Sequence, residues 1–141
     1  MPLLSGIDHC HINVNNLSNA VTWYEKVLGF KVVEELAFWD ETGKGPLTLQ
    51  DRNTTTRLAL FEGQVRSKGI AFGATGEQFI AWLAHFKSMD IKTVLADHGV
   101  TFSIYFKDEC DNSHEITSHD YEHIKMFYPS VEQGSHSAKK S

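Results

Sequence analysis

Apolar and polar residues alternate along the first part of the chain, over Ile7–Val14. A period of two is typical of a β-strand, and it places His9 and His11 on the same face of that strand. The next segment, Ser18–Leu28, has apolar residues at helical spacing, and it follows Asn16, a residue type that caps helices. The pattern therefore predicts a strand followed by a helix.

Three strand-like runs follow this helix, and then the same order of elements begins again. The first three runs are Phe30–Phe38, Leu47–Gln50 and Arg57–Glu62. The second set begins with a short strand at Gly69–Ala74 and a helix opened by the capping-box sequence Thr75–Gln78. Three more strands follow, at Ile91–Leu95, Thr101–Lys107 and Ser113–Ser118. The repeat predicts two βαβββ modules, about residues 4–62 and 68–118, joined by a short polar linker over residues 63–67.

The chain length fits one domain. With 141 residues, of which 41% are hydrophobic, the chain can bury a core without disulfides or metal ions. We expect residues 1–124 to form a single domain. Beyond His123 the apolar pattern fades, so residues 125–141 are predicted to be a tail that is poorly ordered at its end.

Charge and hydropathy narrow the range of partners and locations. Thirteen Lys and Arg against eighteen Asp and Glu give a net charge of −5 without a basic stripe, so we expect no nucleic-acid partner and no membrane partner. No apolar run approaches the roughly 20 residues of a membrane span. The first residues lack the features of a secretion signal, so we expect a cytoplasmic protein.

Several kinds of site have no counterpart in the sequence. We find no nucleophile elbow, no phosphate-binding loop and no dinucleotide fingerprint, so no nucleotide cofactor is expected. Cys10 and Cys110 are far apart and lack the spacing of a zinc knuckle or a redox pair, so we expect two reduced thiols.

The repeat and three local segments together resemble the vicinal oxygen chelate superfamily. The segments are His9 in the first strand, the helical sequence Trp23–Phe30, and the final hairpin with Ser103–Asp108 and Asn112–Ile116. This superfamily includes glyoxalase I, extradiol dioxygenases, and fosfomycin- and bleomycin-resistance proteins. The resemblance covers about residues 5–118. It implies an α+β fold in which the two modules form a half-open, eight-stranded, barrel-like cup with helices outside, and it implies a homodimer.

The family resemblance also implies where a metal would bind. Metal ligands in these families come from the first and fourth strands of each module, positions that correspond here to His9, Ala59, Gly69 and Glu115. Only His9 and Glu115 can bind a metal. The extradiol pattern would place its second histidine at Gly69, and glyoxalase I would add a ligand at Ala59, so the sequence departs from both patterns.

Strand alternation offers a replacement for the missing histidine. His11 shares a face with His9, so His9, His11 and Glu115 could form a set of two histidines and one carboxylate for Fe, Mn or Zn. The alternative for both histidines is a polar wall residue held by hydrogen bonds. A buried Glu115 needs a metal, a proton or a cationic partner such as Arg57.

Other residues are candidates for the wall of the cup because of their position in the strands. Tyr105 and Glu115 are the candidate catalytic residues, with the Tyr105 hydroxyl donating a hydrogen bond to a substrate oxygen. The side-chain-poor face of the fifth strand leaves room for a ligand or allows close packing of the modules. The candidate substrate-binding residues are Trp39, Arg57, Phe61, Gly69, Ala71, Ser103 and Thr117.

The sequence alone leaves two biochemical functions open, and protein association is a further alternative. The first is a metal-dependent lyase, isomerase or dioxygenase that acts on a small vicinal-oxygen substrate, such as an enolate- or catechol-like molecule. The second is a metal-free protein that sequesters a small aromatic or drug-like molecule, as bleomycin-resistance relatives do. A buried His9 and a buried Glu115 at matching positions favour the first function, and the departures at Ala59 and Gly69 favour the second.

Overall fold

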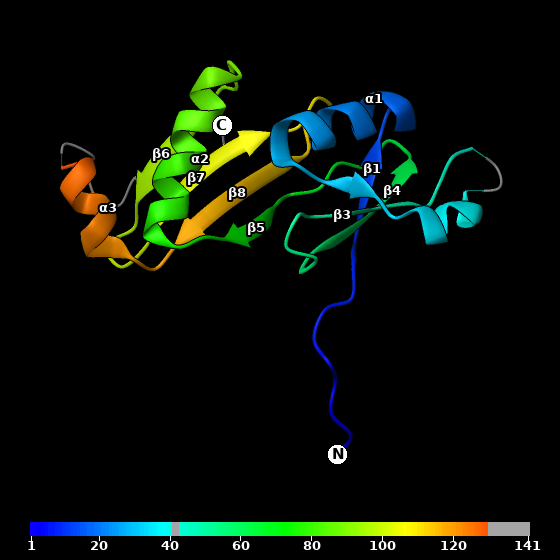
Figure 1. Ribbon diagram of the computed structural model, residues 1–141, viewed down its shortest axis with the longest axis horizontal. Helices are drawn as coiled ribbons and strands as arrows, with labels where there is room; N and C mark the ends of the chain where they lie inside the picture. The colour runs from blue at the N-terminus through cyan, green and yellow to red at the C-terminus, as the bar shows by residue number, and fades with distance from the viewer. Residues whose placement is uncertain (41–42, 130–141) are drawn as a thin grey trace. The chain divides into compact units, whose positions relative to one another are not determined.

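The computed structural model describes residues 1–40 and 43–129, and these residues fall into two compact units. One unit contains Met1–Ser67 with Glu109–Asp111, and the other contains Lys68–Asp108 and the residues from Asn112 on. Each unit has a four-stranded sheet, and the two sheets have the same topology (Figure 1). The expected α+β fold with two tandem βαβββ modules is confirmed. The border between the units falls at the end of the predicted linker.

The first unit places its strands in the order β1-β4-β3-β2. Strand β1 runs parallel to β4, whereas the β3–β4 and β2–β3 pairs are antiparallel. Helix α1 continues into a π-helical turn at residues 24–28, and a 3₁₀ helix follows β2 at residues 34–39. The bounds are β1 Cys10–Val14, α1 Leu17–Trp23, β2 Lys31–Val32, β3 Leu47–Gln50 and β4 Arg57–Glu62.

The helical segment of α1 and the π-helical turn that follows it, residues 17–28, begins and ends within one residue of the predicted Ser18–Leu28. The Asn16 side chain accepts a hydrogen bond from the Asn19 N–H at 2.9 Å, which caps the first turn. Gly29, with φ of 75°, ends the helical segment in the left-handed conformation that glycine adopts without steric cost. The helix buries Leu17 and Tyr24, while β1 buries Ile12 and Val14 and leaves its histidine face outside this core.

The predicted strand over Phe30–Phe38 is wrong for most of its length. Only Lys31–Val32 pairs as β2, and a 3₁₀ helix replaces the rest. The partner strand β3 explains the difference, because it has only four residues and Pro46, just before it, has no N–H to donate. Beyond the bond from Val33 N–H to the Thr48 carbonyl (2.9 Å), the chain satisfies its backbone locally.

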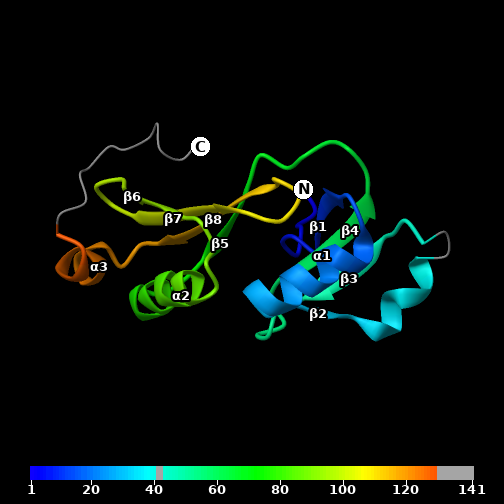
Figure 2. The ribbon, with the colours of Figure 1, turned by 90° about the horizontal axis from the view of Figure 1, so that it is seen from above.

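The second unit repeats the topology with the order β5-β8-β7-β6. Helix α2 lies along one face of this sheet (Figure 2). The capping box is present, with Gln78 N–H donating to Thr75 Oγ1 at 3.2 Å and Thr75 N–H donating to Gln78 Oε1 at 2.8 Å. The bounds are β5 Ile70–Gly73, α2 Gly76–Ser88, β6 Val94–Asp97, β7 Phe102–Lys107, β8 Ser113–Ser118 and α3 Tyr121–Phe127.

Two sequence predictions in the second unit need correction. The strand predicted at Ile91–Leu95 begins later, as β6, because the Ile91 N–H bonds to the Phe86 carbonyl (2.9 Å) and closes the end of α2. The tail predicted from residue 125 overlaps α3. Buried Asp97 holds α3 by accepting hydrogen bonds from the Tyr121 hydroxyl at 2.9 Å and Lys125 Nζ at 3.1 Å. The tail beyond residue 129 lies outside the described residues. Within the described residues, no helix could cross a membrane.

His114 is a buried titratable group in β8. The side chain is 1% exposed and packs between Phe72 and Phe106. Burial lowers the pKa of the imidazole to about 4, and the Asp108 carboxylate, 3.9 Å from Nε2, opposes this shift. His114 is therefore neutral in the folded protein at neutral pH.

This burial predicts acid sensitivity. Between pH 6.5 and about 4 the unfolded chain binds a proton at His114 that the folded chain does not bind, so the free energy of unfolding falls as the pH falls. We expect a loss of about 3 kcal/mol over this window that His114→Leu does not show. Urea unfolding at several pH values measures it, with His119→Leu, at an exposed position, as the control. Equal pH dependence in both variants would contradict the assignment.

Candidate functional site

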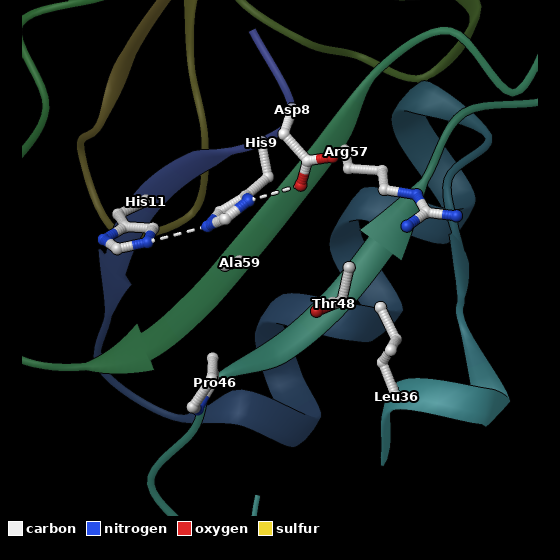
Figure 3. A pocket seen from close by; sticks show the side chains of 8 residues that line it. All are labelled: Asp8, His9, His11, Leu36, Pro46, Thr48, Arg57 and Ala59. Atoms are coloured by element: carbon white, nitrogen blue, oxygen red, sulfur yellow. Dashed lines mark hydrogen bonds and ion pairs between the residues drawn. The ribbon is translucent and has the colours of Figure 1, made fainter. Parts of the chain in front are cut away.

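The sheet of the first unit forms the floor of a cavity. Strand register places His11 beside Ala59, and Ala59 beside Thr48, in one row across β1, β4 and β3. Because Ala59 carries only a methyl group, the larger side chains around it enclose a space of about 270 Å³. We call this cavity the histidine pocket (Figure 3); it is lined by Asp8, His9, His11, Leu36, Pro46, Thr48, Arg57 and Ala59.

A chain of three side chains runs along one edge of the histidine pocket. His9 Nδ1 lies 2.8 Å from Asp8 Oδ2, and His9 Nε2 lies 3.0 Å from His11 Nε2. The ionised carboxylate only accepts hydrogen bonds, so we assign the proton of a neutral His9 to Nδ1 and the donating N–H of the second bond to His11. The hydrogen bond with His9 lowers the pKa of the Asp8 carboxyl, and the charge of Arg57 acts in the same direction.

The two imidazoles share a hydrogen bond, and the separation of their nitrogens can be compared with that of two metal ligands. Metal–imidazole bonds are about 2.0–2.1 Å long, so two such ligands at a right angle have nitrogens roughly 3.0 Å apart. The two Nε2 atoms have this separation, and Asp8 holds the outer nitrogen of His9 as carboxylates commonly do behind metal-binding histidines. Within residues 1–40 and 43–129, however, no group of three His, Cys, Asp or Glu side chains is placed to hold a metal.

His9 and His11 are both exposed, whereas the sequence predicts a buried His9. The His9 side chain is 39% exposed, because His9 precedes β1 and lies at the end of the exposed segment that begins the chain. His11 contacts Phe61 edge to face, with ring centroids 5.0 Å apart. Phe61 therefore supports the histidine pair without lining the pocket. Trp39 ends the 3₁₀ helix, and its side chain lies outside the described part of the structure.

Four candidate residues of the second unit gather on one face of β7 and β8. Register pairs Ser103 with Thr117, and Tyr105 with Glu115. The Ser103 hydroxyl donates a hydrogen bond to Glu115 Oε2 at 2.7 Å, so the partly buried carboxylate has a partner within its own unit. The cationic partner considered for it, Arg57, belongs to the first unit.

Tyr105 has a partner that the sequence analysis missed. Its hydroxyl lies 3.0 Å from His98 Nε2, and His98 is partly buried. Burial raises the pKa of the Tyr105 hydroxyl, and the neighbouring Glu115 charge raises it further, so Tyr105 is a protonated donor at neutral pH. No spacing in the sequence identifies His98, because it lies in the turn after β6 and reaches back toward Tyr105.

Alternate residues in and just before β5 form an open face. Gly69, Ala71 and Gly73 are exposed, and Ala71 pairs with Glu115. Gly69 has φ of 150°, a value that residues with a side chain rarely adopt. A histidine at this position would therefore require a change of backbone conformation.

Comparison of the two registers shows how the candidate ligands are divided between the repeats. Two rows of three residues are equivalent in the two sheets. They are His11–Ala59–Thr48 across β1, β4 and β3, and Ala71–Glu115–Tyr105 across β5, β8 and β7. The first unit therefore has imidazole on its first strand and alanine on its fourth. The second unit has the reverse: no imidazole on its first strand and a carboxylate on its fourth.

Comparisons with known proteins agree with this architecture. The profile of the Glyoxalase/Bleomycin resistance protein/Dioxygenase superfamily matches residues 6–117. The lactoylglutathione lyase structure from Agrobacterium tumefaciens is similar, with a TM-score of 0.69 and 19% identity over 83% of this chain and 96% of that chain. No curated protein matches the sequence.

A second similar structure is the fosfomycin resistance protein FosX from Listeria monocytogenes, complexed with Mn(II) and sulfate. Its TM-score is 0.62, with 17% identity over 89% of this chain and 99% of that chain. A glyoxylase/bleomycin resistance protein/dioxygenase domain from Frankia has a TM-score of 0.64 and 13% identity over 86% and 99% of the two chains. Identities this low support a shared fold.

The Asp8–His9 contact predicts a fixed tautomer. Long-range ¹H–¹⁵N spectra of the metal-free protein should show His9 protonated at Nδ1, and Asp8→Ala should shift the population toward Nε2–H, because the acceptor for Nδ1 is lost. Glu25→Ala, an exposed substitution on the helical segment after α1, is the control and should leave the spectrum unchanged. An unchanged His9 tautomer in Asp8→Ala would show that Asp8 does not orient the ring.

Proposed function

The chain belongs to the Glyoxalase/Bleomycin resistance protein/Dioxygenase superfamily, and on that premise we propose that it binds a divalent metal ion and acts on a small substrate with two adjacent oxygen atoms. The proposed ligands are His9, His11 and Glu115, and Fe, Mn and Zn suit this set. The observation that carries the proposal is the pair of imidazole nitrogens that face each other across 3.0 Å.

The internal repeat supports Glu115 as the third ligand. One module has imidazoles at and just before its first strand and the other has a carboxylate on its fourth strand, so each module has a type of ligand that the equivalent positions of the other lack. Glu115 is held by the Ser103 hydroxyl, which leaves the second carboxylate oxygen available. This division accounts for the departures at Ala59 and Gly69 from the patterns of relatives.

The residues of the chain have distinct proposed roles around such a substrate. When bound, a divalent metal acts as a Lewis acid that stabilises negative charge on a substrate oxygen. Tyr105, kept protonated by burial and by Glu115, donates a hydrogen bond to a substrate oxygen. The remaining candidate contacts belong to the walls of the proposed cup and are Trp39, Arg57, Phe61, Gly69, Ala71, Ser103 and Thr117.

A metal-free binding protein is the second candidate function. The observation that favours it is that the histidine pocket contains two imidazoles but no third metal ligand from its own sheet, because Ala59 occupies that position. In this case His9 and His11 are polar wall residues, and the pocket binds a small aromatic molecule without chemistry. The expected homodimer is common to both functions and is measurable by sedimentation.

Metal binding separates the two functions. We expect chelator-treated protein to take up one Mn²⁺, Fe²⁺ or Zn²⁺ per chain, and His9→Ala, His11→Ala and Glu115→Ala each to weaken this binding by more than the 10- to 100-fold typical of outer-shell changes. Calorimetric titration measures it. Glu77→Ala, an exposed glutamate on α2, is the matched control for Glu115. Protein that binds none of these ions would contradict the metal proposal and favour the binding protein.

A designed third ligand in the first unit provides a gain-of-function test. Ala59 is equivalent by register to Glu115 and lies beside His11, so Ala59→Glu should place a carboxylate next to both imidazoles and tighten Zn²⁺ binding at least about tenfold. Without metal the buried carboxylate should lower the melting temperature, and Zn²⁺ should restore it. Ala59→Gln is the uncharged control. Unchanged affinity in Ala59→Glu would mean that the imidazoles do not face a shared metal position.

A further inference from the structure

Arg57 is a charged group of the histidine pocket to which the metal proposal assigns only a place in the wall. It opens β4, two residues before Ala59 and on the same face, and it is partly buried in the pocket wall. Figure 3 shows the imidazoles toward one side of the lining and the Arg57 guanidinium toward the other, with the Asp8 carboxylate between His9 and Arg57. A ligand that fills the pocket therefore lies near both the imidazoles and the Arg57 guanidinium.

The guanidinium has unused hydrogen-bonding capacity. Within the part of the chain that the structure describes, the Arg57 guanidinium forms no hydrogen bond and no ion pair, and its charge acts on the nearby Asp8 carboxylate. Asp8 supplies the carboxylate in the pocket lining, and its hydrogen bond goes to His9 Nδ1 at 2.8 Å. A guanidinium offers five N–H donors in a planar fork that matches a carboxylate or phosphate group. Its position, partly shielded from water, strengthens such a contact relative to a fully exposed arginine.

We propose that the ligand of the histidine pocket carries an oxyanion, which Arg57 binds while the adjacent oxygens of the ligand face His9 and His11. The inference rests on the proposed function, because it defines the substrate class of the same site. Arg57 is then a specificity-determining residue, and the cavity of about 270 Å³ limits the ligand to a small molecule. Carboxylates and phosphates share the required chemistry.

Three small probes that differ in one group test this inference. Glycerol, glycerate and glycerol 3-phosphate each carry adjacent hydroxyl groups, but only the second and third carry an oxyanion. We expect both anions to bind the wild-type protein at least about tenfold more tightly than glycerol, the usual effect of a charge-assisted hydrogen-bonded pair. The ratio between the two anions shows whether the site favours a carboxylate or a phosphate. Calorimetry measures each affinity with Mn²⁺ and in chelator-treated protein.

Substitutions test whether Arg57 causes the preference for the anions over glycerol. Arg57→Gln should remove the advantage of the anions over glycerol, whereas Arg57→Lys should retain part of it, because lysine keeps the charge but loses the fork. Arg52→Gln is the matched control, because Arg52 is an exposed arginine of the same unit outside the pocket lining and its loss changes the net charge equally. Circular dichroism checks that each variant is folded.

The outcomes separate this inference from the metal proposal. Anions that bind no better than glycerol, or an Arg52→Gln variant that loses as much affinity as Arg57→Gln, would overturn the role of Arg57. Mn²⁺ binding is measured separately by electron paramagnetic resonance. If Mn²⁺ does not bind but the anion preference persists and depends on Arg57, the metal proposal fails and the anion site stands. If Mn²⁺ binds without an anion preference, the metal proposal stands alone.

Discussion

The parallel pairing of β1 with β4 is the constraint on which the candidate site depends. Its register places His11 directly beside Ala59, and β3 adds Thr48 to the same row. Side chains on the other face of β1, Ile12 and Val14, are buried in the core, so a shift by one residue would bury the histidine face and expose the apolar one. The energy of the core therefore maintains the orientation of the imidazoles toward the pocket.

The repeat distributes polar groups so that each unit satisfies its own. In the first unit Asp8, His9 and His11 form a hydrogen-bonded chain, and in the second unit Ser103 holds the Glu115 carboxylate. The chain of the first unit is exposed, whereas Glu115 is partly buried and is tolerated there because it has a hydrogen-bond partner. These bonds also pre-orient the groups, which lowers the entropic penalty of binding a metal or a ligand. The stability of the fold and the proposed function therefore both require these side chains to be held by hydrogen bonds.

Much of the fold could be predicted from local sequence, and the errors have identifiable causes. Asn16 and the Thr75–Gln78 box determine helix starts through contacts within four residues, so their prediction succeeded. The strand predicted over Phe30–Phe38 failed because its length depends on a partner strand that is distant in sequence. Helix α3 was not predicted, because it is held by the ion pair of Lys125 with buried Asp97. A contact between residues so far apart in the sequence leaves no trace in the spacing of apolar residues.

The same division applies to the site. Alternation along the first strand, together with the repeat, determined that His9 and His11 share a face and that Glu115 stands on the last strand, since side-chain direction in a strand follows from position alone. Only the tertiary structure decided that Asp8 binds His9, that His98 binds Tyr105, and that Ala59 opens a pocket beside Arg57. The contact of Asp8 with His9 joins adjacent residues and depends on their side-chain conformations, whereas the other two relations depend on which strands are neighbours. The pattern of residues along the sequence contains neither the side-chain conformations nor the pairing of the strands.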